Sequence, residues 1–272
     1  MKLGFNGATT MTSPLEVDVR IADEAGYDVL EITATKLDKY LESLSIADAR
    51  KLIDAANLKT HAINSVEKIN FRDTSGNIAV LARTRQLAEY ARVLGCPWLV
   101  AVPGPAPAGT PWSEIRANTV SALRAMCDTA RPFGVGLAWE FLGFPWCTVR
   151  TVAQSWEIFQ AVERDNIGMV VDTCHYFAGD STLDSVRAIP AKNWAIFHIN
   201  DVEKMPKEKI EDANRLFPGD GVIPLKEIIE AVRATGFDGV ASVEIFRPEY
   251  WKREPGAVAG EALAKAKKVL EK

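Results

Sequence analysis

Short apolar runs alternate along the chain with longer segments whose apolar residues have helical spacing. The runs are typical of buried strands, and each is followed by a segment with the spacing of an amphipathic helix. We predict strands at residues 2–6, 29–33, 60–64, 98–102, 136–141, 167–173, 195–199 and 239–246. We predict the intervening helices at residues 15–25, 46–56, 77–94, 113–131, 151–163, 182–188, 225–235 and 257–270. Strands that are apolar on both faces and alternate with helices indicate a parallel sheet covered by helices.

Eight such units favour a closed (β/α)8 TIM barrel, an α/β fold, in which functional residues lie at the carboxyl ends of the strands. No linker or change in composition marks a second domain, so we expect residues 1–272 to form one domain. The alternative is an open, doubly wound sheet. That fold usually has a glycine-rich phosphate turn after an early strand, and the segment 7–10 (GATT) is not such a turn.

Four of the predicted strands carry an ionisable residue at the end of an apolar run, one or two positions before the strand ends, namely Glu140, Asp172, His198 and Glu244. Side chains alternate between the two faces of a strand. In residues 136–141 the bulky apolar side chains therefore share one face, and Glu140 lies on the other with small residues. The four strands are consecutive in the chain, and in a barrel their ends would lie side by side around one half of the mouth.

Three carboxylates and one imidazole that converge in this way repel one another unless a cation lies among them. Three oxygens and one nitrogen suit Mn²⁺, Zn²⁺, Co²⁺ or Mg²⁺. A six-coordinate ion would keep two open positions for neighbouring oxygens of a substrate. The alternative for each residue is that it caps a following helix or pairs with a lysine or arginine.

Composition narrows the class of partner. The 272 residues are 47% hydrophobic and 25% charged, as in soluble globular proteins, and the net charge is −4. This charge gives no electrostatic reason to expect nucleic acid or an anionic membrane as a partner. No signal peptide or long apolar run is visible, and the four cysteines lack metal or disulfide spacing. We therefore expect a cytoplasmic protein with reduced thiols.

Over nearly its whole length the chain resembles the xylose-isomerase-like barrel superfamily, and within it the inosose (2-keto-myo-inositol) isomerase family. The most specific matching stretch is 242–250 (SVEIFRPEY). The other matching stretches include 1–10, 26–28, 101–103, 140–149, 164–166, Asp172 with His175, and 198–199. The resemblance implies a (β/α)8 barrel and places the family's metal ligands on Glu140, Asp172, His198 and Glu244. The sequence departs from the family pattern at Gly7 and Phe144, where that pattern has a carboxylate and a histidine.

The resemblance also implies aldose–ketose-type isomerisation of a cyclic polyol ketone, or epimerisation of a ketose, with one divalent metal ion. Such a reaction removes a proton beside a carbonyl, and a cation that chelates both oxygens stabilises the enediolate. Glu140 and Glu244 are then the expected acid and base. His175, Arg247 and Arg215 are candidates for substrate contact. The alternatives are a loop histidine bonded to backbone for His175, pairing with a ligand carboxylate for Arg247, and a polar loop without a catalytic role for Arg215.

Other functions stay open from the sequence alone. The same ligands would serve a lyase that dehydrates a keto-sugar or a 3-dehydroshikimate-like ring. A DNA-repair endonuclease of this superfamily would use many histidines, and this acidic chain has three. A sugar-binding protein would need no cation with free coordination positions. The sequence is compatible with a homo-oligomer and does not decide the oligomeric state.

Overall fold

The computed structural model describes residues 1–271, and its centre is a closed barrel of parallel strands. Around the barrel the strand order is β1-β10-β7-β6-β5-β4-β3-β2. The barrel strands are β1 (Lys2–Asn6), β2 (Val29–Thr33), β3 (Lys59–Val66), β4 (Trp98–Ala101), β5 (Gly136–Glu140), β6 (Ile167–Asp172), β7 (Trp194–Ile199) and β10 (Val240–Val243). The predicted (β/α)8 barrel is confirmed, and the open sheet is excluded.

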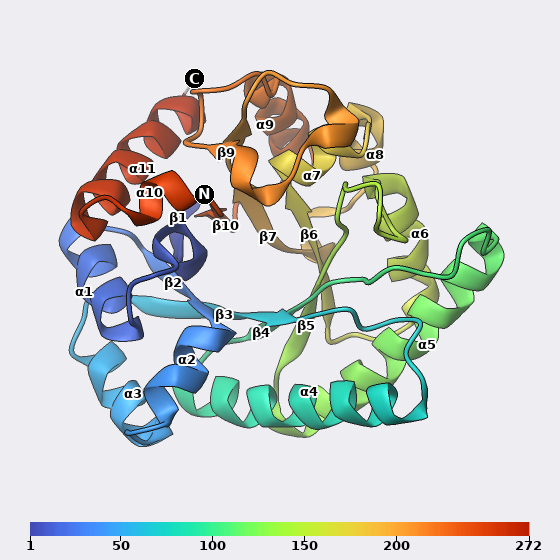
Figure 1. The fold of residues 1–272 in the computed structure, drawn as a ribbon, viewed down its shortest axis with the longest axis horizontal. Coiled ribbons are helices and arrows are strands. Elements are labelled where there is room, and N and C mark those ends of the chain that lie inside the picture. Colours follow the sequence, from blue (N-terminus) through green and yellow to red (C-terminus); the bar gives the residue numbers. More distant parts are fainter. Residues whose placement is uncertain (272) are drawn as a thin grey trace.

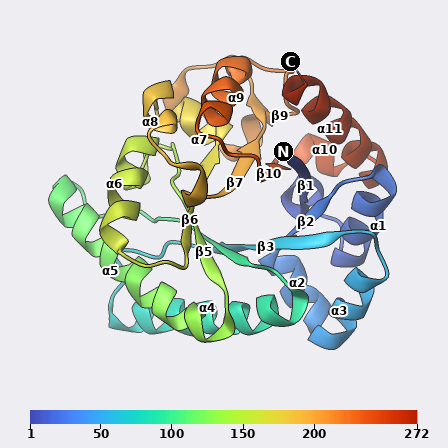
Figure 2. The ribbon, with the colours of Figure 1, turned by 180° about the vertical axis from the view of Figure 1, so that it is seen from behind.

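Helices form a ring around the barrel, which Figure 1 shows from one end and Figure 2 from the other. They are α1 (Leu15–Ala25), α2 (Ala34–Leu41), α3 (Ile46–Asp54), α4 (Thr74–Leu94), α5 (Trp112–Ala130), α6 (Val152–Val162), α7 (Thr173–Ala178), α8 (Leu183–Arg187), α9 (Leu225–Ala234), α10 (Pro248–Trp251) and α11 (Pro255–Leu270). Short 3-10 helices occur at Gly7–Thr10, Arg131–Phe133, Ala191–Asn193, Lys207–Lys209 and Asp212–Asn214. Within residues 1–271, no helix combines the length and apolarity needed to cross a membrane.

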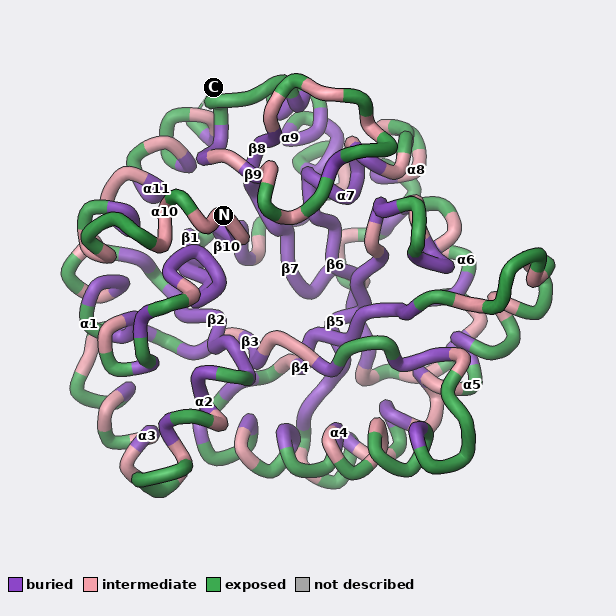
Figure 3. Tube along the Cα trace, viewed as in Figure 1, coloured by how far each residue is buried: buried purple, intermediate pink, exposed green. Residues whose placement is uncertain are grey.

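The core has two layers, as the alternation of side chains predicts. Ala138 on β5 belongs to a small cluster inside the barrel with Val170 and Ile196. Its neighbours Leu137 and Trp139 belong to the larger cluster between the barrel and the helices. Most strand residues are buried, and exposed positions lie mainly on the outer helices and loops (Figure 3). Glu140 has the parity of Ala138 and therefore faces the barrel interior.

Several elements differ from the sequence-based prediction. Helices α2 and α7 directly follow β2 and β6, where loops were expected. The long polar loop 200–221 contains a small antiparallel ribbon of β8 (Asp201–Val202) and β9 (Arg215–Leu216). Helix α4 begins at Thr74 rather than Asn77, because the Asp73 side chain accepts a hydrogen bond from the Gly76 amide and caps the helix. The ribbon carries Arg215, one of the candidate residues, on β9.

Trp98, at the start of β4, packs against the apolar cluster inside the barrel, and this packing requires glycine at two neighbouring positions. A Cβ atom on Gly136 would lie 2.5 Å from Cζ3 and 2.8 Å from Cε3 of Trp98. A Cβ atom on Gly168 would lie 2.9 Å from the Cβ of Ala195 and 3.2 Å from the Trp98 ring. The indole ring is rigid and cannot move aside for an added side chain. Glycine, which has no Cβ atom, therefore allows the two strands to approach it this closely.

Substituting Gly136 by alanine is therefore expected to lower the free energy of unfolding by about 1–3 kcal/mol, the usual cost of overpacking. Denaturant unfolding monitored by circular dichroism measures this change. Trp98→Leu in the same protein should recover part of the loss, since the two side chains compete for one space. Gly260→Ala is the control, because Gly260 lies in α11 with no atom within 4 Å of the added Cβ. An equal loss in both alanine variants would contradict the packing explanation.

Candidate metal centre

The four strand-end residues converge at the mouth of the barrel. One ligand atom each from Glu140, Asp172, His198 and Glu244 can be chosen so that all four lie within 4.8 Å of one another. All four side chains are buried. His198 Nδ1 lies 3.0 Å from Glu140 Oε1 and 3.4 Å from Glu244 Oε2. The structure thus brings together the groups that the strand-end pattern selected.

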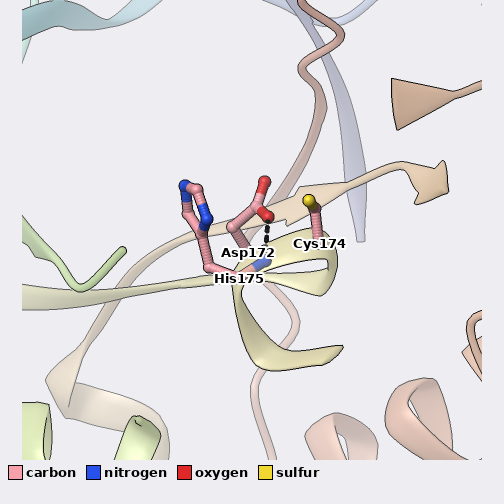
Figure 4. A group of neighbouring side chains, drawn as sticks. All are labelled: Asp172, Cys174 and His175. Carbon is pink, nitrogen blue, oxygen red and sulfur yellow. Dashed lines mark hydrogen bonds between the residues drawn. The ribbon is translucent and has the colours of Figure 1, made fainter. Parts of the chain in front are cut away.

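Asp172 ends β6 and is held from several sides. Its Oδ1 accepts a 2.8 Å hydrogen bond from the His175 amide and so caps α7, as the dashed line in Figure 4 shows. Its Oδ2 accepts from Asn200 Nδ2 at 2.6 Å and pairs with Arg215 Nη1 at 2.7 Å. Although burial opposes the charged form, Arg215 and His175 lower the pKa of Asp172 below its usual value. Helix capping and pairing with an arginine were the alternatives to a metal site. Asp172 does both and also belongs to the cluster.

Asp172, Cys174 and His175 form a second, overlapping group of close ligating atoms (Figure 4). Two of its members are poorly suited to hold a cation. Burial raises the pKa of the Cys174 thiol well above its usual value, so the thiol stays protonated. His175 Nε2 lies 3.1 Å from the guanidinium of Arg215. The larger quartet is thus the better candidate.

His198 lies between carboxylates on both sides of its ring. Its Nε2 atom is 3.0 Å and 3.1 Å from the two oxygens of Glu31, which is buried in the middle of β2. Burial disfavours a charged imidazole, but Glu244, Glu31 and Glu140 raise the pKa of His198 well above its usual value. The same ion pair outweighs burial at Glu31 and lowers the pKa of that carboxyl to about 2.

Glu244 immediately follows β10. Its Oε1 accepts hydrogen bonds from Asn64 at 2.7 Å and Asn6 at 3.0 Å, and its Oε2 pairs with Arg215 at 3.1 Å. Burial raises the pKa of Glu244, and the neighbouring carboxylates act in the same direction.

The charges of the cluster fit a divalent cation. Glu31, Glu140, Asp172 and Glu244 bring four acidic groups to one buried site, whereas Arg215 is the permanent cation among them. A dication supplies the missing positive charge, and the oxygen and imidazole donors suit Mn²⁺, Zn²⁺, Co²⁺ or Mg²⁺.

A pocket opens from this cluster to the surface. Of the quartet, Glu140 and Glu244 line it, together with Asn64, Ser65, Glu67, Lys68, Val102, Pro103, Leu142, Trp146, His175, Asp212, Arg215 and Phe246. The Nδ1 atom of His175 is buried and has no hydrogen-bond partner among residues 1–271. Phe144 packs edge-on against the His175 ring, with the ring centroids 4.8 Å apart. Trp146, which is half exposed, forms part of the outer wall.

The candidate arginines have different surroundings. Arg215 is buried, and its guanidinium is shared among Asp172, Glu244, Asp212 and His175. Arg247 is not among the residues that line the pocket. It pairs with Glu203 at 2.8 Å and donates to the carbonyl oxygen of Arg215 at 3.3 Å. It thus ties the 200–221 loop to the segment after β10.

A larger cavity of about 450 Å³ lies beside α2, at the start of α1. Its buried lysine, Lys36, is already satisfied by Asp18 Oδ2 at 2.6 Å and the Thr10 carbonyl at 2.8 Å. Although Lys36 opposes it, burial raises the pKa of Asp18 to about 6. Gly7 lies next to this pair, and a Cβ there would approach Asp18 Oδ2 to 2.6 Å. No cluster of ligating side chains among the described residues includes the walls of this cavity.

Sequence reasoning missed Glu31 and the amides that support the cluster, Asn6, Asn64 and Asn200. A signal for Glu31 was present, since a carboxylate interrupts the apolar strand 29–33 at its central position. For the asparagines, the available signal was their position at or just after strand ends. His61, the remaining histidine, lies on β3 outside the cluster, and its Nε2 atom contacts the Ala195 carbonyl at 3.0 Å.

A closed (β/α)8 barrel with a buried carboxylate–histidine cluster at its mouth defines the class of protein. The chain belongs to the xylose isomerase-like TIM barrel family, whose model matches residues 19–269. It is 37% identical to an inosose isomerase of Bacillus velezensis over 100% of this chain and 96% of that protein. It is 38% identical to an inosose isomerase of Bacillus subtilis over 98% of this chain and 96% of that protein.

Among solved structures, the chain is similar to a crystal structure of the IOLI protein with a bound zinc atom. The TM-score is 0.96 at 36% identity, over 100% of this chain and 98% of that one. The family resemblance seen in the sequence is thereby confirmed.

Proposed function

We propose that this protein is a divalent-metal-dependent isomerase of a keto-cyclitol, with 2-keto-myo-inositol as the first substrate to test. The observation that carries the proposal is the buried quartet of Glu140, Asp172, His198 and Glu244 beneath an open pocket. The similarity over nearly full length to proteins named inosose isomerase supports this choice of substrate. The zinc atom in the IOLI structure makes Zn²⁺ the first metal to test, with Mn²⁺, Co²⁺ and Mg²⁺ after it.

The proposed reaction moves a carbonyl group to the neighbouring carbon atom. It requires removal of a proton from that carbon and its return to the other. A bound divalent cation would supply the Lewis acidity that stabilises the enediolate. Glu140 and Glu244 are the two quartet members that line the pocket, which supports their assignment as acid and base. Asp172 and His198 lie deeper and would serve as ligands only.

Substrate hydroxyls would meet the polar groups of the pocket wall. His175 lines the pocket, which supports contact between this residue and the substrate. Arg215 lines the same pocket and would face one substrate oxygen. For Arg247, substrate contact remains a prediction, and its hydrogen bonds support a role in holding the 200–221 loop.

A neutral polyol suits this pocket better than an anionic ring. The guanidinium of Arg215 is shared by three carboxylates, so it offers no free charge to a substrate carboxylate. The remaining cation of the wall is Lys68, which is exposed at the rim. This favours inosose isomerisation over dehydration of a 3-dehydroshikimate-like acid. The free, buried cysteines support a cytoplasmic location for the enzyme.

The decisive test incubates the zinc-loaded protein with 2-keto-myo-inositol in D₂O. We expect deuterium at the carbon beside the carbonyl and conversion to an isomeric inosose, both followed by NMR. Removal of the metal with a chelator should abolish both signals, and added metal should restore them. Exchange that persists without metal would contradict the proposal, and a product with enone absorbance would assign the protein to the lyases instead.

A further inference from the structure

We propose that Glu31 is a positioning residue, which fixes the ring of His198 so that Nδ1 is presented to the cation. This inference rests on the proposed metal site and concerns a residue outside the quartet. Glu31 lies at the centre of β2 with only 1% of its surface exposed. Among residues 1–271, its one ion-pair partner is His198. Burial of a carboxylate lowers stability, and here only the pair with His198 offsets that loss. This points to a role for Glu31 that is tied to His198.

The two nitrogens of His198 face different groups. Nε2 lies 3.1 Å and 3.0 Å from the two oxygens of Glu31. Nδ1 lies 3.0 Å from Glu140 and 3.4 Å from Glu244, within the quartet. An ionised carboxylate only accepts hydrogen bonds, so Glu31 requires a proton on Nε2. The lone pair of Nδ1 is then directed to the quartet, as a metal ligand requires.

Asn64 keeps Glu31 in this position. Its amide donates to Glu31 Oε1 at 3.1 Å and to Glu244 Oε1 at 2.7 Å. Moving Glu31 towards the quartet would break its contacts with both His198 and Asn64. The geometry therefore makes Glu31 a support for a ligand rather than a fifth ligand. It also joins two quartet members, His198 and Glu244, through one chain of hydrogen bonds.

Outer carboxylates of this kind orient a histidine and raise its basicity, and losing one typically costs 10–100-fold in metal affinity. Glutamine has nearly the same shape as glutamate but carries no charge. Its amide can also donate to Nε2, which would leave the proton on Nδ1 and block the ligand position. Glu31→Gln is therefore expected to raise the dissociation constant for Zn²⁺ by about 10–100-fold.

The experiment measures Zn²⁺ dissociation constants by competition with a chromophoric chelator, for the wild-type protein and for Glu31→Gln. Long-range ¹H–¹⁵N NMR spectra of the zinc-loaded proteins report which nitrogen of His198 carries the proton. Asp18→Asn is the matched control, because Asp18 is also a buried carboxylate, and its partners are Lys36 and Thr10 rather than a member of the quartet. It should lower the melting temperature yet leave the zinc dissociation constant unchanged.

An unchanged dissociation constant in folded Glu31→Gln would overturn the inference while leaving the proposed metal site intact. Absence of zinc binding in the wild-type protein would instead overturn the proposed function. If Glu31→Gln does not fold, Glu31→Asp replaces it, since aspartate keeps the charge but withdraws the carboxylate by one methylene. A wild-type dissociation constant in that variant would overturn the inference equally.

Discussion

Replacing Glu140 by glutamine is expected to lower kcat for inosose isomerisation by about two to four orders of magnitude, the usual contribution of a positioned acid or base. The physical reason is that the amide of glutamine cannot accept or return a proton, whereas its shape is nearly unchanged. Glu140 lines the pocket and lies 3.0 Å from His198 Nδ1, so it is placed both to hold the cation and to face the substrate. The measurement is steady-state turnover at saturating metal, with bound metal quantified by elemental analysis.

The control is a glutamate outside the pocket lining, at which the same substitution removes a charge but no proposed acid or base. Glu157→Gln makes the same change on α6, where Glu157 is partly exposed and pairs with Arg116 at 2.8 Å. That variant should retain wild-type turnover. Undiminished turnover in Glu140→Gln with its metal bound would refute the assignment of Glu140 as acid or base. Loss of turnover together with the metal would instead show that Glu140 acts through metal retention, so the metal content decides between these roles.

The convergence of the quartet could be predicted from the sequence because each member lies at or directly beside the carboxyl end of a strand. Glu140 and Asp172 close apolar strands, and alternation alone assigns them to the inner face. Parallel strands in a barrel then bring their carboxyl ends to one mouth. No long-range contact had to be known to reach this conclusion.

Glu31 was missed because its role depends on the stagger between strands across the barrel. It lies at the centre of β2 and pairs with Asn6 of β1 in the sheet register. Its contact, His198, is 167 residues away in the sequence. The tilt of barrel strands brings a mid-strand residue of one strand to the level of a strand end elsewhere. A single sequence contains the carboxylate but not that stagger.

The short helices after β2 and β6 were missed for a different reason. Isolated helices of this length are marginal, so their stability comes from packing rather than from local propensity. Ala34, Leu37 and Tyr40 of α2 are buried against the rest of the chain, and α7 is capped by Asp172. These contacts exist only once the barrel has formed.

Replacing Arg215 by methionine is expected to produce the largest loss of stability, about 3–5 kcal/mol, as when one partner of a buried ion pair is removed. Arg215 lies on β9 with 1% exposure and contacts Asp172 Oδ2 at 2.7 Å and Glu244 Oε2 at 3.1 Å. Methionine would fill the space of the aliphatic stem but leave these carboxylates without their counter-charge. The melting temperature of the metal-free protein should fall on the order of 10 °C.

Divalent metal should reverse part of this loss, because the cation and the guanidinium neutralise the same two carboxylates. A ligand that binds only the folded state stabilises it in proportion to the logarithm of its concentration over its dissociation constant. In Arg215→Met the quartet is more negative and free of a competing cation. The rise in melting temperature at a fixed zinc concentration should therefore be larger in the variant than in the wild-type protein.

Arg164→Met is the matched control for this experiment. Arg164 pairs with Asp128 at 2.7 Å, both side chains are partly exposed, and its hydrogen bonds go to Asp128 and the Glu163 carbonyl rather than to the quartet. Partly exposed pairs contribute little, so its loss should cost no more than about 1 kcal/mol and should leave the metal-induced rise unchanged. Equal metal-induced rises in the wild type and Arg215→Met would contradict this account, because Arg215 would then neutralise charges that the cation does not.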